Sequence, residues 1–197
     1  MDATDAGRAA QIVLRASDLP GGGWRASPAS TGADELGSGD DLLDACLAGF
    51  PDPDVTASAE SDRFTRARAL AYAVAWVFSS EAAAEIAFAT LAHERFASAF
   101  VTGMAAEVHP EEGAATLLGH VAAPVAGFEA PGRSAAHQAR LTAADAEGIL
   151  PIHLDLLALQ EERAATLVIL ADSPDPLPGG DVKTVAERVA LRLAGGR

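Results

Sequence analysis

The stretch that decides the fold is ALAYAVAWVF at residues 69–78. In a β-strand successive side chains point to opposite faces, so this order of residues puts large side chains on one face and small ones on the other. The large set is Leu70, Tyr72, Val74, Trp76 and Phe78. Ser79 and Ser80 then break the pattern, and the alanine-rich residues 81–108 predict a helix. We therefore expect a core strand that meets a helix at a sharp, capped corner.

The predicted helix carries two apolar sets that are out of phase. Phe96, Phe100 and Met104 repeat every fourth residue, whereas Ile86 and Leu91 mark an earlier apolar face. A break near residues 92–94 resolves the mismatch.

The second half of the chain is rich in predicted strands. Apolar runs at 135–142, 149–159 and 164–171 have lengths that suit an antiparallel meander. Asp181 then looks like an N-cap, and an aliphatic stripe follows it to Gly195 in a helix that should cover the sheet. The fold class is thus α+β, one domain over residues 1–197, with an antiparallel sheet of strand 69–78 and the meander packed by helices.

The N-terminal part predicts smaller elements around this core. A helix at 5–16 should end before the Leu19–Gly23 run, and a short helix at 41–48 should turn Cys46 inward as an inert thiol. Residues 55–68 read as an edge strand with a turn near Asp62.

Composition excludes several classes of partner. The 197 residues include 28 acidic and 14 basic side chains, a net charge of −14, which repels nucleic acid and anionic membranes. No run approaches the roughly 20 apolar residues of a membrane helix, and residues 1–14 lack the features of a signal peptide. We expect no membrane insertion and a cytoplasmic location, or an extracellular one if an export signal has been removed.

Local patterns along the chain resemble one protein family. They come in the order LPG at 19–21 with Trp24, ACLA at 45–48, VAWVFSS at 74–80 with AAA at 82–84, and RF at 95–96. With the terminal meander and helix, this order resembles the extracellular sensor domain of mycobacterial PknH-type kinases and related actinobacterial lipoproteins. The resemblance implies an α+β domain outside the cell that binds ligands or partners, without established chemistry.

The chain departs from that family in two ways. The resemblance implies a disulfide from Cys46 to a cysteine in the helix after the Arg95-Phe96 pair, where this chain has Ser98, Ala99 and Phe100. An export signal is also missing. Both departures favour an intracellular relative, because disulfides belong to oxidising compartments.

No motif in the chain specifies a chemistry. The five histidines lack the spacing that brings side chains together on a metal. No nucleophile elbow occurs, and the glycines at 21–23 follow a helix rather than a strand, which marks a helix end and not a phosphate loop. We expect no metal, no cofactor and no catalytic residue.

The best candidate site is a set of polar side chains in the meander. Gln138, Arg140 and Thr142 alternate on one strand and His153 and Asp155 on the next. A turn near 145–148 predicts Arg140 opposite Asp155 and Thr142 opposite His153. One interpretation is an ion pair on a solvated sheet face. The other is a cleft in which Arg140 holds an anionic group and His153 titrates near neutral pH.

Tyr72 and Trp76 complete the candidate ligand-binding residues, since their stripe could line a hydrophobic pocket or fill a core. These observations favour a non-enzymatic domain that binds a small molecule or a protein, with a homodimer left open. The alternative is a small α+β enzyme that acts on a hydrophobic molecule between sheet and helices, with Tyr72, Arg140, His153 and Asp155 orienting it or moving protons. A cavity that these polar groups reach would favour ligand binding or catalysis.

Overall fold

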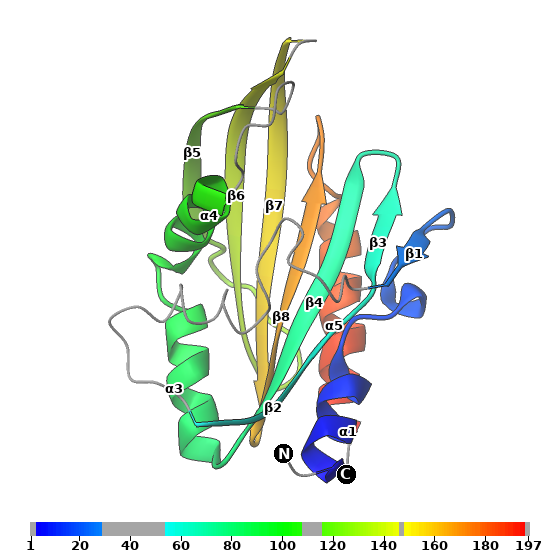
Figure 1. Cartoon of the computed structure of the whole chain (residues 1–197), viewed down its shortest axis with the longest axis vertical. Coiled ribbons are helices and arrows are strands. Elements are labelled where there is room, and N and C mark those ends of the chain that lie inside the picture. Colours follow the sequence, from blue (N-terminus) through cyan, green and yellow to red (C-terminus); the bar gives the residue numbers. More distant parts are fainter. Residues whose placement is uncertain (1–2, 29–53, 108–115, 146–147, 196–197) are drawn as a thin grey trace.

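The computed structural model describes residues 3–28, 54–107, 116–145 and 148–195. In chain order its elements are α1 (Ala3–Ile12), η1 (Ala16–Asp18), β1 (Arg25–Ser27), β2 (Val55–Glu60), β3 (Arg63–Arg66), β4 (Ala69–Phe78), α3 (Glu81–Leu91), α4 (Phe96–Glu107), β5 (Thr116–Pro124), β6 (Arg133–Asp145), β7 (Gly148–Glu161), β8 (Ala164–Asp172) and α5 (Gly179–Gly195). Figure 1 shows one twisted sheet with α3 and α4 on one side and α1 and α5 on the other. The predicted α+β class is confirmed.

The sheet is antiparallel throughout, with strand order β1-β3-β4-β8-β7-β6-β5. Strand β2 also pairs with β4, so β2 and β3 follow one another along the same side of it. Between them Ser61 bonds to Ala73 twice, because its N–H donates to the Ala73 carbonyl and its Oγ accepts the Ala73 N–H, each at 2.9 Å. The predicted edge strand at 55–68, with its turn near Asp62, is therefore two strands with a short break.

Strand β4 separates two hydrophobic cores, as its alternation predicts. Tyr72, Val74, Trp76 and Phe78 pack with residues of α3 and α4. The alanines between them face the core that α1 and α5 complete. Trp76 is only 1% exposed, so the predicted strand is buried on both faces and small side chains leave room for the helices behind it.

The predicted corner and helix break are both present. Ser80 caps α3, since its Oγ accepts the N–H of Ala83 at 3.2 Å. Helix α3 ends at Leu91 and α4 begins at Phe96. The break lets Leu91 of α3 and Phe96 and Phe100 of α4 pack on the same face of the sheet. The expectation that Ile86 shares this apolar face is wrong, because Ile86 is 40% exposed.

The predicted meander is confirmed as β6, β7 and β8, with α5 packed on the sheet as expected. The prediction that Asp181 is the N-cap of α5 is wrong. The helix begins at Gly179, because the Pro178 carbonyl accepts the N–H groups of Asp181 and Val182. Asp181 lies in the first turn instead, where its charge complements the helix dipole.

The N-terminal helix is shorter than predicted. It ends at Ile12 rather than residue 16, because Asp18 accepts the Arg15 N–H at 2.7 Å and Arg192 of α5 donates to the Val13 carbonyl at 2.9 Å. These bonds satisfy backbone groups that a longer helix would have used.

Two strands that border the sheet, β1 and β5, were not predicted. The predicted helix at 41–48, with Cys46, lies outside the described residues. No helix in the described ranges is both long and apolar enough to cross a bilayer.

Candidate functional site

The polar residues of the meander meet across β6 and β7, in a register different from the predicted one. Gln138 lies opposite Asp155 and Arg140 opposite His153, while Thr142 faces Pro151. The predicted pairs of Arg140 with Asp155 and Thr142 with His153 are wrong by two residues. The reason is a tighter hairpin than expected, in which Asp145 pairs directly with Gly148 and thereby sets every later partner.

These side chains lie on the α5 face of the sheet, at the edge of its core. The neighbouring cross-strand pair on this face, Ala136 and Leu157, is buried in the core that α5 completes. Beyond it the face changes from apolar core to polar surface. The next two pairs on this face are Gln138 with Asp155 and Arg140 with His153. Alternation along β6 and β7 requires all of them to share this face.

A cleft of about 590 Å³ and another of about 430 Å³ open on opposite faces of the sheet. The smaller one contains the meander residues and is lined by Val121, Ala123, Gln138, Ala139, Arg140, His153, Leu154, Asp155 and Pro176. We call it the α5-face cleft. Pro176 comes from the segment between β8 and α5, which is tied to β7 by a 2.7 Å bond from Ser173 Oγ to the Pro151 carbonyl. Strands β5, β6 and β7 thus form the base of the cleft, and the segment between β8 and α5 forms one side of it.

Asp155 is the buried charge of this cleft. It is 4% exposed, and its Oδ1 accepts a hydrogen bond from Gln138 Nε2 at 2.9 Å. Burial raises the pKa of the Asp155 carboxyl, while the Gln138 bond and the nearby His153 act in the opposite direction. A carboxyl group with a perturbed pKa in a cleft is a feature of ligand and active sites.

Arg140 contrasts with Asp155, because its side chain is exposed. Within the described ranges it has no hydrogen bond and no ion pair. Its guanidinium keeps five donors in a fixed fork, which suits a carboxylate or a phosphate.

Tyr72 and Trp76 lie on the other side of the sheet. Both are buried in the core against α3 and α4, where they fill space rather than line the α5-face cleft. The structure therefore brings together three of the five candidate residues, Arg140, His153 and Asp155, and separates the two aromatic ones from them.

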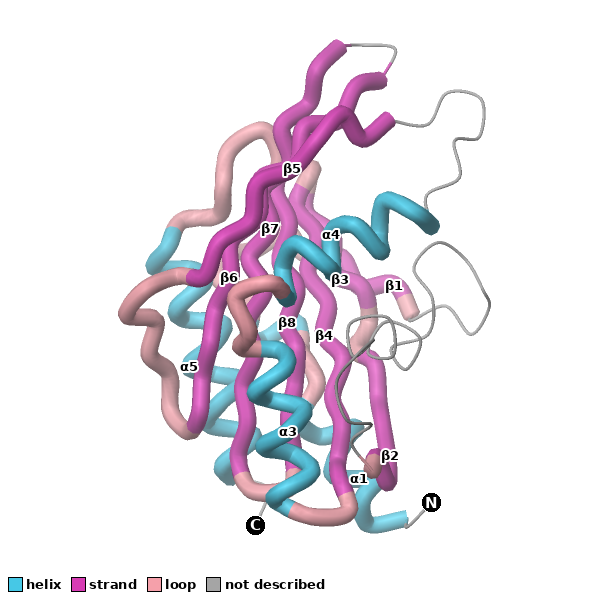
Figure 2. The backbone as a smooth tube through the Cα atoms, turned by 90° about the vertical axis from the view of Figure 1, so that its left-hand side faces the viewer, coloured by secondary structure: helices cyan, strands magenta, loops and turns pink. Residues whose placement is uncertain are grey.

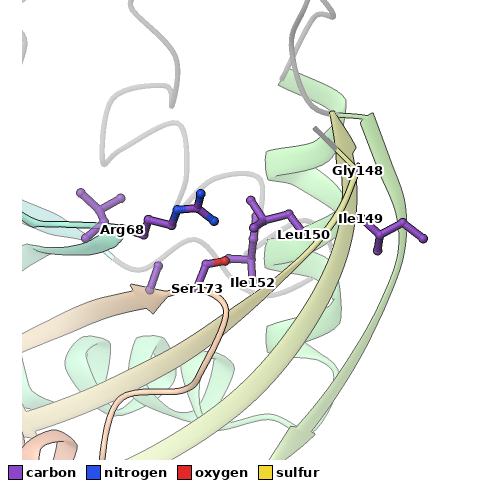
Figure 3. A pocket seen from close by; sticks show the side chains of 8 residues that line it. Arg68, Gly148, Ile149, Leu150, Ile152 and Ser173 are labelled. Carbon is purple, nitrogen blue, oxygen red and sulfur yellow. The ribbon is translucent and has the colours of Figure 1, made fainter. Parts of the chain in front are cut away.

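The larger cleft, on the α4 face, contains none of the candidate residues (Figure 3). Its lining is mostly aliphatic, with Leu70, Leu150 and Ile152, and Arg68 reaches in from the far side. We take the smaller cleft as the candidate site because several polar groups converge there around a buried carboxyl.

Sequence reasoning missed two walls of this cleft. Val121 and Ala123 belong to the unpredicted β5, and Pro176 belongs to a loop that no motif marks. The alternation of apolar residues in β5 is weak, since glycine and alanine interrupt it. The described residues contain no group of three or more acidic, histidine or cysteine side chains that could hold a metal ion.

Comparison with known proteins found a likeness of structure but none of sequence. No protein-family model matches the chain, and no curated protein matches it. Among solved structures, the crystal structure of the extracellular domain of PknH from Mycobacterium tuberculosis is similar, with 11% identity, 96% of each chain covered and a TM-score of 0.48. The family resemblance predicted from the sequence stays a prediction.

Proposed function

We propose that this chain is a non-enzymatic binding domain that holds a small molecule with an anionic group in the α5-face cleft. The observation that carries the proposal is the pairing state of Arg140. It lies at a cleft beside a buried carboxylate, yet it forms no ion pair with any described residue. An arginine that is not engaged by its own protein is available for a ligand.

The arrangement of the neighbouring side chains supports this role. Asp155 lies on the next rung and is held by Gln138, so it does not neutralise Arg140 by direct contact. A carboxylate can accept more than one hydrogen bond, so Asp155 is suited to a ligand N–H or O–H group. Beside these polar groups, the apolar side chains of Val121 and Ala123 line the cleft from β5, opposite Arg140 and Gln138. A ligand with an anionic end, a short apolar body and a donor group fits this pattern.

The test is a binding screen with variants of Arg140. We would titrate aliphatic carboxylates, hydroxy acids, amino acids and phosphate monoesters into the protein by calorimetry and thermal shift. For any ligand that binds, R140A should weaken affinity at least about tenfold, or ~1.4 kcal/mol. R95A is the matched control, since Arg95 is exposed on the turn between α3 and α4, away from the cleft. Unchanged affinity in R140A, or no binding by any anion in the panel, would contradict the proposal.

The alternative of a small enzyme rests on one observation, the raised pKa of Asp155 beside His153. Tyr72 does not belong to this candidate active site, because it lies on the opposite face of the sheet. If the cleft is catalytic, D155N should abolish turnover of a hydrophobic ester or epoxide while R140A changes mainly KM. Absence of any turnover by the wild type would leave the binding function.

A protein partner is a further occupant of the same cleft. An acidic side chain or a C-terminal carboxylate would satisfy Arg140 in the same way as a small anion.

The net charge of −14 disfavours nucleic acid. The cytoplasmic location expected from the sequence stays a prediction.

A further inference from the structure

Strand β5 forms one border of the sheet. It pairs with β6 on one side, and no described residue pairs with it on the other. Figure 2 looks onto this border of the sheet, where α4 lies to one side of β5. An exposed border of this kind offers unpaired N–H and C=O groups to another strand.

The register shows which backbone groups of β5 point outward. Val125 N–H donates to the Ala136 carbonyl at 2.8 Å, and this contact continues the register of Ala123 with Gln138 and of Val121 with Arg140. Bonded and non-bonded pairs alternate in an antiparallel ladder. Ala123 and Val121 therefore bond to β6, and the N–H and C=O groups of His120 and Ala122 point away from the sheet.

Strand β5 carries exposed apolar side chains and no acidic residue. Val121 is 74% exposed, and Leu118 of the same strand is also exposed. None of the 28 acidic residues of the chain lies within 116–124, 138–144 or 148–154. In a protein of net charge −14, two copies repel each other overall, and a border strand that carries no acidic residue does not add to that repulsion.

We infer that β5 pairs with β5 of a second copy, antiparallel and about a two-fold axis at Val121. His120 of one copy then exchanges both backbone hydrogen bonds with Ala122 of the other, and the same happens on the far side of the axis. Val121 meets its own counterpart in a non-bonded pair, with Cα atoms about 4.5 Å apart. The contact is isologous, so it closes at two copies.

The pairing extends the sheet across the axis and places both α5-face clefts on one side of it. Val121 lines the cleft of its own copy, so the second copy would add its Val121 to the rim of that cleft. The inference does not rest on the proposed function, because it depends on the border of β5 alone. Molecular mass tests it, whereas anion affinity tests the cleft.

Charge variants at the axis provide the test. The wild type should sediment with twice the 20.0 kDa mass of one chain. V121E and V121K should each sediment as single chains, because like charges face each other, and an equimolar mixture of the two should recover the double mass. L191E, at an exposed leucine of α5, is the matched control and should keep the wild-type mass. A wild type that stays a single chain up to its solubility limit, a larger assembly, or a double mass in both V121 variants would overturn the inference.

Cross-linking gives a second readout that needs only a small side chain. In a C46S background, V121C should form a disulfide-linked dimer under mild oxidation, because facing residues in a non-bonded pair lie within disulfide range. L191C in the same background should stay a single chain. Equal cross-linking of the two variants, or none in V121C, would count against the axis at Val121.

Discussion

Gln138 Nε2 donates a hydrogen bond of 2.9 Å to Asp155 Oδ1 across β6 and β7, and Asp155 is almost fully buried. The bond gives the carboxyl a neutral partner rather than a cationic one. Desolvation therefore dominates and raises the pKa of Asp155. Burial of a charge without an ion pair costs stability, and proteins retain such groups mainly at functional sites.

We predict that D155N stabilises the protein at neutral pH. The folded state holds the Asp155 proton more tightly than the unfolded chain does, since its folded pKa is raised. This contribution to stability is complete below about pH 4, the unfolded value, and is lost as the pH rises through the folded value. Asparagine can still accept the Gln138 bond and carries no charge. The free energy of unfolding at pH 7 should rise by roughly 1 kcal/mol, within the usual range of stabilising substitutions.

Urea unfolding of D155N and wild type at several pH values measures this effect. The gain should shrink toward zero in acid, where Asp155 becomes protonated. D175N, at an exposed acidic residue before α5, is the control and should show little difference at any pH. If D155N is less stable than wild type at pH 7, the carboxylate is stabilised by its surroundings and the desolvation argument is wrong.

His137 gives a second, opposite pH dependence. Its Nε2 lies 2.9 Å from the Leu91 carbonyl at the end of α3, and its ring packs on Phe96 at the start of α4. Burial lowers the pKa of His137 despite the Leu91 bond, and His93 lowers it further. The neutral ring therefore ties the α3–α4 turn to the sheet.

Wild-type protein should lose stability as the pH falls below about 6.5, because the unfolded chain then takes up a proton that folded His137 resists. H137Q should be less stable at pH 7.5, by about 1–2 kcal/mol for the lost packing and hydrogen bond. Its disadvantage should narrow toward pH 5. H120Q, at a half-buried histidine of β5, serves as the control. A disadvantage of H137Q that stays constant from pH 7.5 to 5 would show that His137 is not resisting protonation.

The sequence predicted the parts of the fold that depend on local alternation. The bulky and small faces of residues 69–78, the break between Leu91 and Phe96 and the three long strands of the meander follow from side-chain size and spacing alone. Each of these patterns is strong because burial on a given face leaves few residue types to choose from.

The candidate site was predictable only in part. Arg140, His153 and Asp155 were recognisable as polar residues on facing strands, but their partners depend on a hairpin that closes at Asp145 and Gly148. Shifting the centre of a turn by one residue changes every pair by two. The single glycine of this run, Gly148, is compatible with more than one turn centre. The wall at Pro176 depends on tertiary packing, which no local pattern contains.

Arg192 of α5 forms an ion pair with the buried Asp18 that should contribute strongly to stability. Two of its nitrogens contact the two carboxylate oxygens of Asp18 at 2.6 Å, and one of them also donates to the Val13 carbonyl. The Asp18 side chain is almost fully buried. R192A leaves that carboxylate without its charged partner, so unfolding should become easier by about 3–5 kcal/mol.

A double-mutant cycle separates the pair from its surroundings. The double variant D18N/R192A should be less destabilised than the sum of the two single variants, by about 1–3 kcal/mol. The reason is that D18N removes the carboxylate that R192A leaves without a partner. R188A, at an exposed arginine that bonds to the carbonyls of Ser17 and Asp18, is the control for lost contacts to the same loop. Strict additivity in the cycle would mean that Asp18 and Arg192 act independently.

The two faces of β4 should respond oppositely to a change in side-chain volume. Trp76 fills the core against α3 and α4, so W76A should cost about 3–5 kcal/mol through lost burial and a cavity. Ala73 has no exposed surface and lies on the face toward α1 and α5, where A73L should cost about 1–3 kcal/mol by overpacking. A82L, at an exposed position of α3, introduces the same larger side chain without a packed neighbour and should change stability little. If A73L were neutral, the alanine face would not be in close contact with the helices, and the small residues of β4 would need another explanation.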